Sequence, residues 1–419
     1  MNTYEAGNTR PNDLGTVPRN SQRIGILFLL GALSAFGPLS MDMYLPSTPT
    51  IAASLHASQL TVQLTMSGCL AGLALGQLVA GPLSDSLGRK PPLLAGLAGF
   101  VLMSVACAMA PDIQTLIAFR FLQGTAGAAG VVLSLAMVRD LYEGSELTSA
   151  LASLTLVFGL APVAAPLIGG QVLRFTSWRG VFGVLAAVGV VLLLASSFLR
   201  ETLPEHRRTP PRFRQMLAAS RTLFADPQFS GNALAVGFGT GALITYVSSI
   251  PFIIEVAYGK SPQVFSLLFT INAVGLTAMA QLGSRLSRHM DPARITRLAL
   301  ALMVTGGAAF GAITLTAHAT GHAPLRTLLV PLFGFVAALG MMRPNATALA
   351  MARHQSIAGT ASAYMGSLQF TIGAIFAPLA GLGGQGATIP TGIVIGLLCV
   401  TAILAQALIA GESEIPVMD

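Results

Sequence analysis

The chain has 419 residues, of which 53% are hydrophobic and only 9% are charged, and its net charge is +7. About a quarter of the residues of a soluble domain are charged, so this chain cannot cover a water-facing surface and most of it must face lipid. The positive charge does not indicate nucleic-acid binding, because the basic residues are spread over many loops. Cys69, Cys107 and Cys399 lie inside apolar stretches, and their odd number argues against a disulfide framework.

Twelve apolar stretches are each long enough to cross a membrane as a helix, which takes roughly 20 residues. The first six cover residues 24–47, 60–80, 91–110, 113–136, 148–170 and 180–199. The second six cover residues 228–254, 263–284, 296–317, 326–350, 358–382 and 389–410. The two-residue alternation of a membrane barrel strand is absent. We therefore predict an all-α membrane protein with twelve transmembrane helices in two pseudo-symmetric six-helix bundles.

The longest polar stretch lies midway along the chain and divides it into two halves. We predict a cytoplasmic N-terminal tail (1–23), a first bundle (24–199), a cytoplasmic linker (200–227), a second bundle (228–410) and a cytoplasmic C-terminal tail (411–419). The linker is either a plain solvated segment or a short amphipathic helix on the membrane surface.

The positions of Lys and Arg predict the orientation in the membrane. If the N-terminus is inside the cell, cytoplasmic segments hold 18 of the 23 basic residues, Arg343 among them, and outer loops hold four. The remaining one, Arg120, lies inside an apolar stretch. This asymmetry predicts that both termini are cytoplasmic.

The first apolar stretch contains an acidic residue in the segment Ser40-Met41-Asp42-Met43-Tyr44-Leu45-Pro46. An ionised carboxylate inside a membrane is costly, so Asp42 is expected to face a cavity and either to have a partner or to take up a proton. Burial raises the pKa of a carboxyl group and a nearby cation lowers it. A carboxyl group subject to both effects can change its protonation as its surroundings change, which a proton-coupled carrier requires. The alternative is a static ion pair.

The segment Gly81-Pro82-Leu83-Ser84-Asp85-Ser86-Leu87-Gly88-Arg89-Lys90 predicts a short basic turn between the second and third stretches. Its pattern, G-x-x-x-D-x-x-G-R-K, resembles the loop between the second and third helices of the major facilitator superfamily of transporters. The resemblance implies a conformational latch made of Gly81, Asp85, Gly88, Arg89 and Lys90. It also implies that the Asp pairs across the interface between the halves in an outward-facing form. The alternative is that the two basic residues only set the topology.

The fourth stretch offers a partner for Asp42. Arg120 and Gln123 lie three residues apart, which is about one helical turn. Arg keeps its proton in proteins, so Arg120 is predicted to act as a fixed charge; the alternative is a structural donor to backbone carbonyls. The sequence R-x-x-Q-G resembles a motif of the same superfamily that is tied to proton coupling. The corresponding part of the tenth stretch, near Val330 to Gly334, has no such Arg, which predicts that proton handling is confined to the first half.

The fifth stretch is predicted to be kinked, because Pro162 and Pro166 remove two backbone hydrogen bonds from one face of the helix. Gly169 and Gly170 follow and allow close helix packing. This segment resembles the exporter-associated motif G-P-x-x-G-G, with Ala165 where Gly is usual. The alternative is a packing kink without meaning for the direction of transport. In the second stretch, the four-residue spacing of glycines predicts another close helix contact, at Gly68, Gly72 and Gly76.

Nine polar, aromatic or methionine side chains within the stretches are candidate substrate-binding residues, although each such residue alone more often serves in packing. They are Met41, Tyr44, Gln123, Phe158, Tyr246, Asn272, Tyr364, Gln369 and Phe370. No nucleophile–base pair and no set of metal ligands lies within the stretches. We therefore predict no catalytic residue, no metal site and no cofactor, and a carrier rather than an enzyme.

Together with Arg200-Glu201-Thr202-Leu203 and with Pro344-Asn345-Ala346-Thr347-Ala348, these motifs resemble the bicyclomycin- and chloramphenicol-resistance family of drug:proton antiporters. The resemblance covers residues 24–410. It implies the major facilitator fold and a monomeric exporter in the bacterial inner membrane, which moves small amphipathic drugs outward as protons enter. A proton symporter that imports a sugar or another metabolite is the alternative. The prolines of the fifth stretch and the lack of polar sugar-binding side chains argue against it.

Overall fold

The computed structural model describes residues 20–208, 220–320, 323–354, 357–384, 386 and 388–410. Residues 1–19 and 411–419 of the predicted tails and residues 209–219 of the predicted linker lie outside this part of the chain. The regular structure within it consists of helices, with no strand.

The described residues of the first half form seven α-helices and one short 3-10 helix. These are α1 (Asn20–Asp42), η1 (Leu45–Ser47), α2 (Thr48–Ser54), α3 (Gln59–Leu87), α4 (Lys90–Ala108), α5 (Ile113–Leu141), α6 (Gly144–Phe175) and α7 (Trp178–Ser197). The single turn η2 (Glu205–Arg207) follows α7.

The second half is also helical, with π-helical and 3-10 turns next to three of its helices. Its elements are α9 (Pro227–Pro251), η3 (Phe252–Ala257), α10 (Pro262–Leu286), α11 (Pro292–Thr320), α12 (Leu325–Met351), α13 (Ala358–Phe376), η5 (Ala377–Gly381), α14 (Thr388–Ala405) and η6 (Gln406–Ala410).

The predicted all-α membrane architecture is confirmed. Ten helices of the described residues are long and apolar enough to cross a membrane, and the number is eleven if the bent pair Gly25–Gly37 and Leu39–Ser54 counts as one span. Each of the twelve predicted stretches falls on a helix, including α6. The helices are often longer than predicted, because residues at the membrane surface extend them beyond the apolar part.

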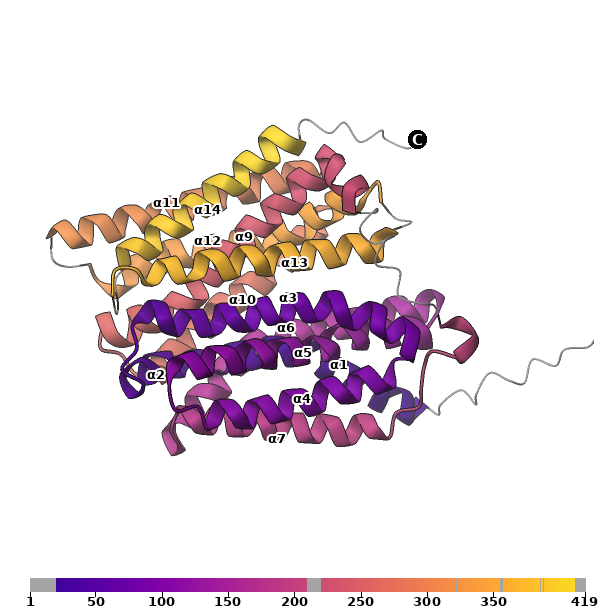
Figure 1. The fold of residues 1–419 in the computed structure, drawn as a ribbon. Coiled ribbons are helices and arrows are strands. Elements are labelled where there is room, and N and C mark those ends of the chain that lie inside the picture. The colour runs from indigo at the N-terminus through magenta and orange to yellow at the C-terminus, as the bar shows by residue number, and fades with distance from the viewer. Residues whose placement is uncertain are drawn as a thin grey trace, which may run out of the picture.

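The helices of the two halves form two bundles that lie side by side with their long axes roughly parallel (Figure 1). Helix α3 of the first half packs on α13 of the second, and α6 packs on α10. We call the end of the bundles that carries the α3–α4 and α7–α9 connections the terminal end. The opposite end, with α2 and the η3–α10 connection, is the distal end (Figure 1).

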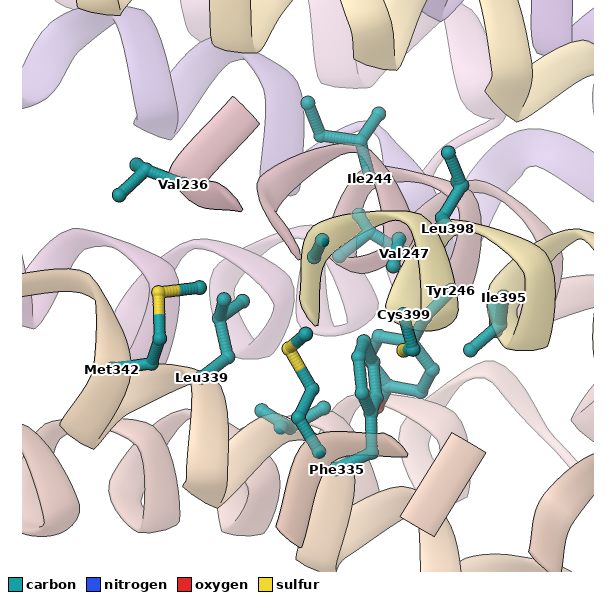
Figure 2. Close-up of a cluster of buried hydrophobic side chains, with 14 of the residues drawn as sticks. Val236, Ile244, Tyr246, Val247, Phe335, Leu339, Met342, Ile395, Leu398 and Cys399 are labelled. Carbon is teal, nitrogen blue, oxygen red and sulfur yellow. The ribbon is translucent and has the colours of Figure 1, made fainter. Parts of the chain in front are cut away.

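Buried hydrophobic side chains form two clusters, one drawn mainly from each half. Figure 2 shows part of the second cluster, where side chains from α9, α12 and α14 meet; Tyr246, Phe335 and Cys399 are among them. The predicted boundaries of the two bundles stay a prediction.

The small-residue face predicted on the second stretch is confirmed as a close helix contact. A Cβ atom at Gly72 would collide with the carbonyl oxygen of Phe121, and one at Gly76 would collide with that of Thr125. Glycine therefore sets the distance between α3 and α5, because a larger residue would force the two backbones apart.

One arginine lies elsewhere than predicted. Arg343, which the sequence placed among the cytoplasmic residues, lies inside α12, eight residues before the helix ends at Met351. At about 1.5 Å per residue, it is about 12 Å from the terminal end of this helix. The prediction that both termini are cytoplasmic therefore rests on the other basic residues.

Candidate functional site

Asp42 is the last residue of α1 and lies where the first membrane-crossing segment is interrupted. The helix axis bends by 44° between Gly25–Gly37 and Leu39–Ser54. The side chain of Asp42 is half-buried, and it forms no hydrogen bond or ion pair with any residue that the structure describes. The predicted ion pair with Arg120 is therefore wrong for this conformation.

Arg120 is fully buried in α5 and has other partners. Its Nη1 donates a hydrogen bond to Gln123 Oε1 at 2.6 Å, and Gln123 Nε2 in turn donates to Ser104 Oγ at 2.7 Å. The Cζ atom of Arg120 lies 4.7 Å from the centroid of the Tyr44 ring, and the Tyr44 hydroxyl is hydrogen-bonded to Thr65. The ring of Tyr44, two residues after Asp42, thus covers the guanidinium in place of the expected carboxylate.

The hydrogen-bonding capacity of Arg120 is only partly used. Its Nε and Nη2 atoms are buried and have no hydrogen-bond partner among the described residues. Buried donors without acceptors are costly, and a charged group raises the cost further. The site therefore combines a half-buried carboxyl group with a buried guanidinium that has donors to spare. The proton-coupling roles of Asp42 and Arg120 stay predictions.

Burial separates the candidate substrate-binding residues into two groups. Tyr44 and Gln123 are fully buried, and Tyr246 is 2% exposed and stacks on Phe269 with ring centroids 6.1 Å apart. Three further candidates are also buried, Met41, Asn272 and Gln369. Tyr364 and Phe370, both on α13, are only partly buried, whereas the side chain of Phe158 lies outside the described residues. In this conformation Tyr44, Gln123 and Tyr246 are therefore closed to solvent, whereas Tyr364 and Phe370 keep part of their surface exposed.

The predicted turn at residues 81–90 is much shorter than expected. Helix α3 continues through Gly81 and Pro82 to Leu87, and only Gly88 and Arg89 connect it to α4. Gly88 has a φ of +91°, which favours glycine, and a Cβ atom there would lie 2.5 Å from Glu201 Oε2. The proline does not end the helix, and α3, which packs on α5 and α13, continues for five residues beyond it.

The latch residues form a network within the first half. Arg89 Nη1 donates to Asp85 Oδ1 at 2.6 Å, and Arg89 Nε donates to Asp140 Oδ2 at 2.9 Å. Lys90 Nζ donates to the Ser197 carbonyl at 2.7 Å. Asp85, near the end of α3, therefore pairs with Arg89 of the same half, and it forms no ion pair with a described residue of the second half.

Glu201 is a part of this network that the sequence analysis did not assign. Four backbone N–H groups donate to its carboxylate, those of Arg89 (2.8 Å), Lys90 (3.1 Å), Thr202 (2.9 Å) and Leu203 (3.0 Å). Partial burial alone raises the pKa of Glu201, but these hydrogen bonds outweigh it and hold the pKa below its ordinary value of 4.5. The contact that ties the start of the linker to α4 is therefore present above pH 4.5 and is lost as the pH falls through the lowered pKa.

We expect Glu201→Gln to release the linker from the α3–α4 connection. The amide keeps one acceptor oxygen but has no negative charge to hold four donors, so the linker should open more often. The measurement is the rate of trypsin cleavage in residues 200–208, which should rise by roughly threefold to tenfold, since losing a charge-assisted contact costs about 1 kcal/mol at a partly exposed site.

Glu205→Gln is the matched control, because Glu205 lies in the same segment but its side chain is 89% exposed. Equal cleavage of both variants and the wild type would contradict the role assigned to Glu201.

Helix α6 is continuous through Pro162 and Pro166. After them, Gly169 lies against the Met43 carbonyl, with which a Cβ atom would collide, and a Cβ atom at Gly170 would lie 2.5 Å from Ser266 Oγ of α10. The segment that follows the prolines thus touches both the chain next to Asp42 and the other half of the molecule.

We expect Gly169→Val to destabilise the fold by at least about 2 kcal/mol, because the new side chain must push the backbone at Met43 away. Thermal unfolding of the purified variant in detergent measures this change. Gly159→Val is the control in the same helix, since nothing lies within 4 Å of a Cβ atom at Gly159. Similar unfolding temperatures for the two variants would show that Gly169 does not set this contact.

Hydrogen bonds that join the two halves lie toward the distal end, and we call them the distal contacts. They run from Gln63 Nε2 to Ser248 O (3.3 Å) and Ser249 Oγ (3.0 Å), from Gly386 N to Gln59 Oε1 (2.9 Å), from Gln263 Nε2 to Gly170 O (3.0 Å), from Ser266 Oγ to Pro166 O (2.8 Å) and from Thr270 Oγ1 to Val163 O (3.3 Å). At the terminal end, by contrast, the described ion pairs of Arg89 stay within the first half and that of His354 with Asp226 stays within the second.

Comparisons with known proteins agree on one family. The family model described as Major Facilitator Superfamily matches residues 28–378. An uncharacterized MFS-type transporter, YdgK of Bacillus subtilis, is 39% identical over 400 residues, which are 95% of this chain and 97% of that protein. A bicyclomycin resistance protein homolog of Haemophilus influenzae is 33% identical over 389 residues, with 92% and 96% covered.

Among solved structures, a bacterial homolog of the human lysosomal transporter Spinster, in an inward-facing and unoccupied conformation, matches with a TM-score of 0.71. The match covers 95% of this chain and all of that one at 15% identity, so it concerns the fold alone.

Proposed function

This chain belongs to the major facilitator superfamily and is a membrane transporter rather than an enzyme, and from that premise we propose that it exports small drug-like molecules in exchange for protons. The name of the relative from Haemophilus influenzae supports an antibiotic as the exported compound. The half-buried Asp42 without a partner carries the proposal for the proton, because such a carboxyl group can bind and release one. The transporter works as a monomer in the bacterial inner membrane, with both termini in the cytoplasm, and uses the proton gradient without a cofactor.

The distal contacts support an assignment of the conformation. With the termini in the cytoplasm, the distal end faces outward, and the hydrogen bonds of Gln63, Gln263 and Ser266 close the outer side of the interface. Asp85 pairs with Arg89 of the same half, which supports a latch between the halves that is open. We assign this structure to the inward-facing state, in which the binding site is open to the cytoplasm.

The transport cycle then follows from the positions of the charges. A drug molecule enters from the cytoplasm or the inner leaflet, and Asp42 releases its proton to the cytoplasm. The ionised carboxylate is stabilised when it moves toward the N–H donors of Arg120 that have no partner. This movement displaces the Tyr44 ring. The halves rock to the outward-facing form, where Asp42 takes up a proton from outside and the drug leaves. The membrane potential contributes about 2.3 kcal/mol per 100 mV for each net charge that moves inward.

The test uses purified protein in liposomes that contain a pH-sensitive dye, with a pH gradient imposed across the membrane. Chloramphenicol, bicyclomycin and other small antibiotics are added on one side at a time. Proton movement opposite to the drug supports the antiporter. Proton movement in the same direction as a solute would make the protein a symporter, and no coupling to any compound would leave the family assignment without this function.

A further inference from the structure

Helix α12 carries a charged side chain inside the membrane that the proposed cycle does not use. Arg343 is half-buried, and it makes no hydrogen bond, ion pair or ring contact with any residue that the structure describes. Its guanidinium keeps its proton at all physiological pH values, so the charge is permanent. A permanent charge at this depth requires water or an anion as its partner.

Other arginines away from open solvent are paired. Arg120 donates to Gln123, and Arg89 forms ion pairs with Asp85 and with a second carboxylate on α5. The fold thus provides partners for these guanidinium groups and leaves the one on α12 without any. The lack of a partner among the described residues therefore distinguishes Arg343 from Arg120 and Arg89.

The packing of α12 fixes the direction in which Arg343 points. Met342 packs on α9, where its ε-methyl group would lie 2.7 Å from a Cβ atom at Gly239. The Phe333 ring packs on α10, 2.5 Å from a Cβ position at Gly275. Side chains follow one another at about 100° around an α-helix, so Arg343 leaves the helix between these two directions.

The opposite side of α12 faces away from the protein. Val330 is 73% exposed, and it lines an apolar surface groove with Ala309 and Ile313 of α11. Arg343 comes thirteen residues later, which places it roughly 140° around the helix from Val330. The guanidinium therefore points into the molecule, between α9 and α10, rather than into lipid.

We propose that Arg343 is an anion-binding residue of the substrate site, where it binds the carboxylate, phosphate or other acidic group of a small amphipathic monoanion. A guanidinium offers five N–H donors in a planar fork that matches such groups. This inference rests on the proposed function, because it assigns the charge class of the exported compound. Asp42 and Arg343 lie in different halves and form no ion pair with each other, so both stay available to ligands.

A negatively charged substrate changes how strongly the membrane potential drives export. Export of a monoanion in exchange for one proton moves two net positive charges inward, so the membrane potential makes twice the contribution that it makes for one charge. For the export of a neutral drug in exchange for one proton, the contribution of the membrane potential is half as large. Acidic compounds should therefore be exported against steeper gradients than neutral ones.

The test compares 1-naphthoate with 1-naphthamide, which have the same ring system with and without the negative charge. Binding to the purified full-length protein is measured by calorimetry in an uncharged detergent, with empty micelles as the blank. We expect the wild type to bind naphthoate at least about tenfold more tightly, the range of one charge-assisted contact. Arg343→Gln should remove this preference, and Arg343→Lys should keep part of it. Arg353→Gln is the control, because Arg353 is 58% exposed and pairs with Asp226.

Equal affinity of the wild type for both compounds, or an unchanged preference in Arg343→Gln, would overturn the proposal. A second arm adds phosphatidylglycerol or phosphatidylcholine to the micelles. Binding of the anionic lipid without binding of naphthoate would assign Arg343 to a lipid headgroup and would also overturn it. The assay needs no proton gradient, so a failure of drug:proton antiport would leave this result interpretable.

Discussion

Asp42→Asn is expected to abolish proton-driven drug export while the protein stays folded in the membrane. Asn has the size of Asp but cannot bind and release a proton, so a pH gradient can no longer drive transport. We expect the export rate in liposomes to fall by at least about tenfold, to the level of lipid alone, since the substitution removes the only proposed proton carrier. Exchange of drug down its own concentration gradient should persist.

Asp112→Asn is the matched control for this substitution. Asp112 is the N-cap of α5 at the distal end, where its carboxylate accepts a hydrogen bond from Thr115 N at 2.8 Å. Asn caps helices about as well as Asp, so this variant should transport like the wild type. Full proton-driven export by Asp42→Asn would remove Asp42 from the mechanism.

Arg120→Lys should reduce proton-driven transport by about tenfold, although it keeps the positive charge. Lys has no planar fork to hold Gln123 while it stacks on the Tyr44 ring, so the buried charge would lose its fixed position. The initial rate of drug-dependent proton uptake measures the effect, and size-exclusion chromatography checks that the variant is folded.

Arg179→Lys tests the same chemistry at another position. Arg179 lies 4.1 Å from the Trp178 ring centroid and donates to the Ala110 carbonyl at 3.1 Å, but it is at the distal end of α7. We expect this variant to transport nearly as well as the wild type. Wild-type rates for Arg120→Lys would mean that only the charge of Arg120 matters.

The helices could be predicted because the membrane imposes a simple length rule. Each apolar stretch of roughly 20 residues became a helix, and glycine spacing correctly indicated the contact of Gly72 with α5. Helix ends were less predictable, since α3 continues past Pro82 to Leu87. A proline inside an apolar stretch is therefore not a sufficient signal for the end of a helix.

The partners of the charged residues could not be predicted from spacing. Asp42 and Arg120 are the two charges in apolar stretches that sequence reasoning paired, yet the Tyr44 ring lies on the guanidinium instead. A sequence does not show which of two neighbouring side chains reaches a buried group. The count of basic residues likewise assigned Arg343 to the cytoplasmic side, although this residue lies within the predicted stretch 326–350 and inside α12.

The contacts of Glu201 with the latch and the distal contacts could not be predicted from the sequence either. Glu201 meets Arg89 from 112 residues away, and its only sequence signal is the four-residue motif after the sixth stretch. The distal contacts use Ser, Thr and Gln side chains, which occur in most of the helices. Only the fold brings these polar groups together at one end of the interface.

The most direct test of the account is to count protons released when a drug binds. Purified protein in weakly buffered detergent is mixed with a saturating amount of a transported antibiotic, and the pH change is followed with a dye. We expect the wild type to release up to about one proton per drug molecule bound, and Asp42→Asn to bind the drug without any release. Binding without proton release in the wild type, or equal release by both proteins, would contradict the claim that Asp42 couples drug export to proton entry.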